Sequence, residues 1–381
     1  METISVTPAR GLSARVPDDS AENGPVTSRL IRDFDELASI SVAWDQMVAR
    51  SDFDDVFATY GFARAWWRAY GSSKNLHVAV LEDGDSRPKL IAPLYSENSS
   101  SRTLRVVGDP RGDYNNLIFE KADQRSVGIF FSWLRARNGW RSLRLAKLPA
   151  ESAIHSHFPF ACGASDRRMR KLRCWMRIGS LLVCSHPPTS HPRINSSKLE
   201  EIKDLLAGWN YRKHVYWFGR QGKLEYRRLS SVSDCLAMLS EFMDLHIAEF
   251  AAKGMKSLFV EEDNRRFYRF MLEELDRYST VRLDCLTLDG KLIAGHFGFD
   301  WDGRLYYYKP CFEPKYSSHS PGKVLFGHIV KDAVERGLCE IDFLTPGGDY
   351  KTKYASDFRA KSSLMVYRRP FAALLDRRNF R

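Results

Sequence analysis

A loop of small residues between positions 317 and 322 carries the pattern that points most directly to chemistry. Three consecutive tyrosines, residues 306–308, precede it in a strand-like run, and apolar residues recur at helical spacing from Lys323 onward. Free backbone N–H groups and the positive end of a helix dipole together favour a bound phosphate. The candidate residues are Ser318, Ser320, Pro321, Gly322 and Lys323. Loops of this composition are also common turns, so other residues must support the hypothesis.

Four further positions are candidates for a site. Asp342, in the short apolar run after the helix, could act as a base or orient a substrate, or it could form an ion pair. Asp113 and Tyr114 stand where a glycine-rich loop rejoins a strand, and could bind a hydroxyl or an ammonium. The alternative is that Asp113 caps a turn and Tyr114 packs. His246 falls inside an apolar helical stripe, where a core histidine is the more common interpretation.

The composition favours a globular protein with a negatively charged partner. The chain has 381 residues, 44% of them hydrophobic and 28% charged, which excludes wholesale disorder. Its length predicts two domains. The net charge of +11 suggests nucleic acid, a nucleotide cofactor, anionic lipid or an acidic polymer, although an ordinary basic protein remains an alternative.

Cysteine usage and hydropathy predict a reduced compartment and no metal site. The 7 cysteines are scattered, and none has metal-ligand spacing with another cysteine or a histidine. We find neither a signal-peptide core nor an apolar run long enough to span a bilayer. The expectation is a cytoplasmic protein that could touch the inner face of the membrane through its charge.

The local patterns divide the chain into five parts. We expect a flexible tail over residues 1–27, a first α/β unit over 28–185 and a proline-rich linker over 186–197. A second unit is expected over 198–370 and a basic tail over 371–381. Both units show a similar order of elements without close sequence similarity, so any duplication must be structural.

The segment from Phe312 to Ala355 resembles the C-terminal motif of the GNAT-type acetyltransferases associated with cellulose and exopolysaccharide biosynthesis, the CelD/BcsL-like family. Further matches are Arg212-Lys213, Leu245-His246 and Gly108 with Asp113-Tyr114, and Glu313 stands where the family has aspartate. The matching positions of the C-terminal motif are Tyr307, Tyr308, Phe312, Pro314, Tyr316, Ser320, Pro321, Gly322, Leu325, Gly337, Asp342, Phe343, Leu344, Gly347, Tyr350 and Lys351.

This resemblance implies an α/β fold of two tandem GNAT-like domains, with mixed sheets flanked by helices, akin to the FemABX aminoacyltransferases. It also implies transfer of an acetyl group from acetyl-CoA to a nitrogen or oxygen of a sugar. The acceptor would be a saccharide precursor of an exopolysaccharide or of a holdfast-type adhesin. The polysaccharide-synthesis machinery would be a further partner, and no metal is expected.

Acyl transfer needs a held thioester, a base, and a donor for the thioester oxygen or the leaving thiolate. On this resemblance, Ser318 and the Ser320–Lys323 helix start would bind the phosphates of CoA. Asp342 would be the base or orient the acceptor, Tyr350 the proton donor and Lys351 the charge stabiliser. The residues expected to bind the substrate are Asp113, Tyr114, His246 and Arg212.

Two alternatives remain open. One is a FemABX-like aminoacyltransferase that uses charged tRNA, with the basic stretches 167–177 and 210–228 as contacts. Such enzymes usually insert a long coiled-coil pair, which this sequence lacks, so nucleic acid is the less favoured partner. The other is a degenerate GNAT that binds a nucleotide signal such as a cyclic dinucleotide. The candidate residues for it are Arg368, Arg369, Arg377 and Arg378.

Overall fold

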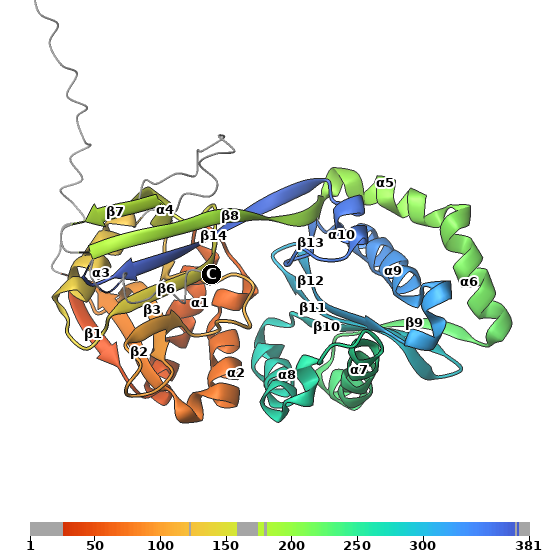
Figure 1. The fold of residues 1–381 in the computed structure, drawn as a ribbon, viewed down its shortest axis with the longest axis horizontal. Helices are drawn as coiled ribbons and strands as arrows, with labels where there is room; N and C mark the ends of the chain where they lie inside the picture. Colours follow the sequence, from red (N-terminus) through yellow and green to blue (C-terminus); the bar gives the residue numbers. More distant parts are fainter. Residues whose placement is uncertain (1–25, 122, 158–173, 179–180, 370–371, 373–381) are drawn as a thin grey trace, which may run out of the picture.

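The computed structural model describes residues 26–121, 123–157, 174–178, 181–369 and 372 (Figure 1). The expected tails at 1–27 and 371–381 lie almost entirely outside these ranges, as do residues 167–173 of the basic stretch. Within the described part, fourteen strands form one sheet in which strands of both units are neighbours. The order along its main path is β1-β2-β3-β4-β6-β14-β8-β13-β12-β11-β10-β9.

The first unit consists of a strand, two helices, three antiparallel strands, and a helix that leads to a parallel strand. β4 and β6 pair in parallel, and α3 makes the connection between them. The short β5 pairs with β3. The elements are β1 (Thr27–Ile31), α1 (Ser41–Ala49), α2 (Tyr60–Tyr70), β2 (Asn75–Glu82), β3 (Pro88–Ser96), β4 (Thr103–Val106), β5 (Ile118–Phe119), α3 (Gln124–Ala136) and β6 (Ser142–Pro149).

The second unit repeats this order of elements. β12 and β13 pair in parallel, and α9 connects them as α3 connects β4 to β6. Its elements are β9 (Leu224–Leu229), α7 (Val232–Ala252), α8 (Glu262–Leu275), β10 (Val281–Leu288), β11 (Lys291–Trp301), β12 (Arg304–Phe312), the 3-10 turn η7 (Pro314–His319), α9 (Pro321–Glu335) and β13 (Glu340–Asp342). The expected pair of related α/β units is therefore confirmed, and the duplication is structural.

The remaining elements join or flank the two units. They are α4 (Ile154–His157), β7 (Cys174–Ile178), β8 (Leu181–Asn195), α5 (Ser196–Ala207), α6 (Trp209–Gln221), α10 (Asp349–Tyr354) and β14 (Asp357–Tyr367). Helices α7 and α8 cover one face of the second unit, and α5, α6 and α9 cover the other (Figure 1). No described helix is both long and apolar enough to cross a bilayer.

One hydrophobic core runs through both units and fixes their relative position. It combines Trp44 and Phe62 of the first unit with Phe242, Tyr268 and Phe299 of the second, all of them buried. Burial of such aromatic surface is the main favourable term in packing the units together. The core therefore holds loops of the first unit firmly against strands of the second.

Strands β8 and β14 cross from one unit to the other (Figure 1). They pair along their lengths, β14 also pairs with β6, and β8 pairs with β13 at its far end. Residues 186–195 therefore belong to a strand, and the expectation of a linker there was wrong. The prolines fit because β8 pairs with β7 only up to Ser185, and its pairing with β13 begins only at Arg193. Between these two points no strand of the described residues pairs with that edge of β8.

Close packing of α6 on α9 predicts a contrast between two helical glycines. A Cβ atom at Gly327 would lie 2.4 Å from the ring of Tyr211, whereas one at Gly219 would meet nothing within 4 Å. We expect Gly327→Ala to lower the free energy of unfolding by about 1–3 kcal/mol through overpacking. The control Gly219→Ala should raise it by up to about 1 kcal/mol, because alanine favours the helix. Urea denaturation of both variants measures the difference, and equal values would contradict the packing described.

Candidate active site

Strands β12 and β13 diverge beside the loop that the sequence singled out. Their parallel pairing ends at Tyr306 and Asp342, yet β12 continues to Phe312. The Glu313 N–H bonds the Ile293 carbonyl of β11, so the alternate positions Pro310 and Phe312 turn their backbone away from β11. A proline is tolerated here because no strand of the described part pairs with β12 on that side.

A backbone donor in this open half of β12 has a side-chain partner on the diverging side. The Phe312 N–H donates to Glu249 Oε2 of α7 at 3.0 Å, and Glu249 is buried. Glu249 also forms an ion pair with the Lys253 ammonium. The Glu249 carboxylate thus satisfies the Phe312 N–H at the open end of β12. The chain then continues directly into η7 and α9.

The structure brings four of the five expected phosphate-binding residues together where α9 begins. Ser318 and Ser320 lie in the turn, and Ser320 adopts a left-handed conformation (φ 51°) before Pro321 and Gly322 open the helix. Gly322 lies in the first turn, where a helix offers N–H groups without intrahelical acceptors. Lys323 points elsewhere, because its Nζ donates to the Asn210 carbonyl of α6 at 3.1 Å.

Helix α6 supplies positive charge beside this helix start. Burial lowers the pKa of Lys323, and the ammonium groups of Lys353 and Lys213 lower it further, so three lysines lie near one another. Arg212 precedes Lys213 on α6 and is exposed. This places Arg212 on the same helix as the basic flank of the loop, so its charge would act on a phosphate there.

Asp342 is the centre of a buried ion-pair network. Its carboxylate, which is 0% exposed, accepts from the Leu344 N–H at 2.7 Å, the Tyr114 hydroxyl at 2.5 Å and Arg359 Nη1 at 2.6 Å. Arg359 also binds both oxygens of Glu340 at 2.7 and 3.1 Å. Both oxygens of Asp342 are occupied, which favours the ion-pair role over direct contact with a substrate.

Tyr350 and Lys351 lie on α10, after β13. The Lys351 Nζ donates to the carbonyls of Phe343 and Thr345 at 3.1 and 3.0 Å, and burial lowers its pKa to about 8. Tyr350 is 36% exposed, and its ring lies 6.2 Å from that of Phe343. Burial raises the pKa of Tyr350 to about 12, so its hydroxyl stays protonated at neutral pH.

Asp113 brings four lysines together at the junction of the two units. Its carboxylate accepts from Lys147 Nζ at 3.2 Å and from the Thr345 hydroxyl at 3.0 Å. Burial alone would raise the pKa of Asp113, but Lys147, Lys361 and Lys309 hold it well below its usual range. With Lys351, these residues form what we call the lysine cluster: Lys147, Lys309, Lys351 and Lys361.

His246 lies in the core, as the more common interpretation of the sequence suggests. It is 2% exposed, its Nδ1 lies 2.9 Å from the Ser257 hydroxyl, and its ring stacks on Phe250. Burial lowers its pKa to about 4, with a further contribution from Lys309, so the imidazole is neutral at neutral pH. It therefore packs beneath the lysine cluster as an uncharged group.

Sequence reasoning missed Arg359, Lys361, Lys309, Lys147 and Glu249. One signal was available: Arg359 and Lys361 stand two residues apart in a strand, so both face the same side of the sheet. Both also contact Tyr114 of the first unit, more than two hundred positions away, which no local pattern reveals. Among the described residues, no cluster of His, Cys, Asp and Glu could hold a metal ion.

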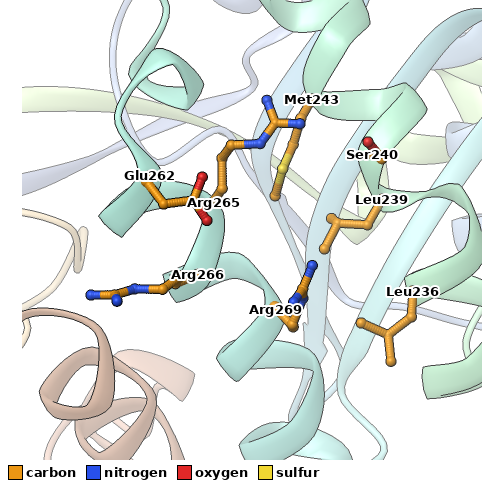
Figure 2. Close-up of a pocket in the computed structure, with 8 residues that line it drawn as sticks. All are labelled: Leu236, Leu239, Ser240, Met243, Glu262, Arg265, Arg266 and Arg269. Atoms are coloured by element: carbon orange, nitrogen blue, oxygen red, sulfur yellow. The ribbon is translucent and has the colours of Figure 1, made fainter.

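A groove of about 390 Å³ lies between α7 and α8 and is separate from these residues (Figure 2). Leu239 and Met243 of α7 face Arg265 and Arg269 of α8 across it, whereas Arg266 extends away from α7. Of the residues that line it, none belongs to β12, η7, α9 or the lysine cluster.

The lysine cluster predicts a rise in stability with pH. Burial lowers the pKa of Lys351 and of Lys361 from 10.5 to about 8, so between these values the folded protein binds fewer protons than the unfolded chain. The cost of burying each ammonium is present in full below about pH 8 and is relieved as the pH rises. We expect each lysine to add about 1–2 kcal/mol of stability between about pH 7.5 and pH 9.5.

Urea denaturation at the two pH values tests this expectation. Lys361→Met should show a smaller rise than the unsubstituted protein, whereas the exposed control Lys331→Met should show the full rise. An identical rise in Lys361→Met would contradict the effect assigned to burial of Lys361.

Comparison with known proteins identifies one family that matches part of the chain. Residues 209–352 match the family described as acetyltransferase (GNAT) domain. The matched range includes β12, the η7 turn, α9, β13 and Lys351. No curated protein matches the chain.

Three solved structures share the fold at low sequence identity. FemX has a TM-score of 0.57 at 9% identity, covering 92% of this chain and 99% of that one. The C-terminal domain of a candidate lysylphosphatidylglycerol synthetase from Agrobacterium fabrum has 0.52 at 12% identity, covering 89% and 94%. A conserved protein of unknown function from Bacteroides thetaiotaomicron has 0.51 at 10%, covering 90% and 100%. Residues 209–352 are therefore similar to the acetyltransferase (GNAT) domain family, and they lie within an α/β fold of two tandem units.

Proposed function

We propose that the protein transfers an acyl group, in the favoured case acetyl, from acyl-CoA to a nitrogen or oxygen of a sugar. The acceptor would be a precursor of an exopolysaccharide or adhesin, as the CelD/BcsL-like resemblance implies. The main observation that supports acyl-CoA as the donor is the divergence of β12 from β13 beside the N-terminus of α9. The reaction would take place in the cytoplasm, with contact to the membrane surface or to the polysaccharide-synthesis machinery as a further part of the proposal.

The residues at the start of α9 suit the phosphates of CoA. The N–H of Gly322 and the helix dipole favour a pyrophosphate there, and Lys213, Lys353 and Arg212 add positive charge around it. The backbone groups of β12 beyond Tyr306 would line the pantetheine arm by strand-like hydrogen bonds. This direction leads the thioester toward Lys309 and the junction of the two units.

Residues at that junction would assist the transfer. The protonated hydroxyl of Tyr350 could donate a proton to the departing thiolate. Lys351, with its pKa of about 8, is partly neutral near that pH and could accept a proton or stabilise negative charge. Asp342 would act by positioning, because it holds Tyr114 and Arg359 beneath the site.

A second candidate function is aminoacyl transfer from charged tRNA. It is supported by the fold likeness to FemX and by the basic helix α6, whose positive charge would suit an RNA backbone as well as a CoA phosphate. Binding of a nucleotide signal is a weaker third candidate. Arg368 and Arg369 lie after β14, and Arg377 and Arg378 lie outside the described residues.

Thermal shift assays with acetyl-CoA, CoA, aminoacyl-tRNA and a cyclic dinucleotide separate these candidates. Acyl-CoA transfer predicts that both CoA species raise the melting temperature of the full-length protein, since a ligand that binds the folded state stabilises it. Stabilisation by aminoacyl-tRNA alone would favour the second candidate. If neither CoA species raised the melting temperature, the proposed function would be contradicted.

A further inference from the structure

The lysine cluster carries more positive charge than the protein neutralises. Lys147, Lys309, Lys351 and Lys361 lie around Asp113, and Asp342 is a second carboxylate that acts on Lys351 and Lys361. Asp342 is also paired with Arg359, so the four ammonium groups outnumber the carboxylates available to them. Burying ammonium groups without compensating anions costs free energy, so an excess of this kind calls for an explanation.

One of the four lysines has a hydrogen-bond acceptor for every N–H of its ammonium group, and the other three do not. Lys147 donates to Asp113 and to the carbonyls of Pro110 and Gly112, which uses all three of its protons. Lys351 donates to two carbonyls, and Lys361 to one, that of Leu344 at 2.7 Å. Each of these two therefore keeps at least one N–H without a protein acceptor among the described residues.

Lys309 is the least satisfied of the four. No acceptor in the described part of the chain lies within hydrogen-bond distance of its ammonium, although Lys309 influences both Asp113 and His246. The side chain is half-buried, and its Nζ is not among the polar atoms sealed from solvent without a partner. Burial lowers the pKa of Lys309, so an anion that entered here would raise that pKa again.

The cluster also lies where an acceptor would have to enter. Lys309 is on the half of β12 that has diverged from β13, about 10 Å before Phe312 at the strand's rise per residue. Lys351 follows β13, and Lys361 lies over the face of Tyr114 at 3.9 Å. Three spare ammonium donors from three different elements thus converge on the inner end of the proposed donor path.

We propose that Lys309, Lys351 and Lys361 bind a phosphate group of the acceptor, so that the acceptor is a phosphate ester rather than a finished, neutral polysaccharide. The inference rests on the proposed function and names its substrate class. A phosphate accepts hydrogen bonds from several directions at once, and lysine binds it as a point charge. A reaction that forms a sugar phosphate or a lipid-linked sugar phosphate must then precede this one.

Calorimetric titration of the full-length protein with glucosamine 1-phosphate and with glucosamine tests the proposal. We expect the phosphate ester to bind at least about tenfold more tightly, and Lys309→Met to remove at least about tenfold of that affinity. Lys309→Arg, which keeps the charge, should stay within a few-fold of the unsubstituted protein. Lys331→Met, an exposed lysine of α9, is the matched control and should change nothing.

Equal, measurable binding of the two sugars, absence of binding both to glucosamine 1-phosphate and to vesicles that contain phosphatidic acid, or an unchanged affinity in Lys309→Met would overturn the proposal. Titration of the same variants with acetyl-CoA separates this failure from failure of the proposed function, because the donor contacts do not include Lys309's ammonium. Phosphatidylcholine vesicles with and without phosphatidic acid distinguish a lipid phosphate from a soluble one: binding only to the acidic vesicles assigns the lipid form, and binding only to the sugar phosphate assigns the soluble form.

Discussion

Replacing Arg359 with methionine is expected to lower the free energy of unfolding by about 3–5 kcal/mol, because it leaves the buried carboxylate of Asp342 without its ion-pair partner and Glu340 with Arg193 alone. Arg359 lies 2.6 Å from Asp342 and 2.7 Å from Glu340, and the side chains of these three residues are 5%, 0% and 9% exposed. Burial of an unpaired carboxylate costs far more than the loss of a surface ion pair. Urea denaturation measures the change.

Two further variants make the Arg359 prediction specific. Arg359→Lys keeps the charge but cannot reproduce the forked geometry that binds both oxygens of Glu340, so we expect an intermediate loss. Arg87→Met breaks an exposed contact with Asp85 at 3.8 Å and should change stability by less than about 0.5 kcal/mol. If Arg359→Met lost no more stability than Arg87→Met, the buried network around Asp342 would not stabilise the fold as described.

The second large effect concerns donor binding and should leave stability intact. Gly322→Asp places a carboxylate in the first turn of α9, where a CoA pyrophosphate would lie. We expect the dissociation constant for acetyl-CoA to rise by about 10- to 100-fold, which corresponds to about 1.4–2.8 kcal/mol. The same carboxylate interacts favourably with the positive end of the helix dipole, so the free energy of unfolding should stay constant or rise by about 0.3–1 kcal/mol.

Gly322→Ala is the control for this substitution. Its Cβ atom would lie 3.5 Å from the Phe312 ring, an ordinary contact, so affinity for acetyl-CoA should change by less than about threefold. Calorimetric titration of both variants, with urea denaturation alongside, separates charge repulsion from misfolding. Unchanged affinity in Gly322→Asp would mean that the phosphates bind elsewhere.

Local patterns predicted those parts of the fold that local chemistry determines. The Asp289-Gly290 and Asp302-Gly303 turns have positive φ at both positions, as the hairpin type expected from these residues requires. The small-residue loop does lead into a helix, which begins at Pro321. In each case the residues that specify the structure are neighbours in sequence.

The parts that the sequence did not reveal depend on partners far along the chain. Proline-rich residues 186–195 suggested a linker because nothing local indicates that β14 pairs with them. The basic and acidic side chains around Asp342 and Asp113 come from both units and from β14. These side chains meet only because the shared core places the first unit's loop, residues 108–114, against β12. There the Tyr308 hydroxyl donates to the carbonyl of Arg111 at 2.8 Å. The roles expected for Asp342, Tyr350 and Lys351 in catalysis stay predictions.

Hydrogen–deuterium exchange of the full-length protein, with and without acetyl-CoA, tests the proposed donor site most directly. We expect acetyl-CoA to protect backbone amides in residues 308–325, at the open half of β12, the η7 turn and the first turn of α9. This protection should be lost in Gly322→Asp at the same ligand concentration and kept in Gly322→Ala. Protection confined to other segments, or no protection at a saturating concentration, would contradict an acyl-CoA site at the start of α9.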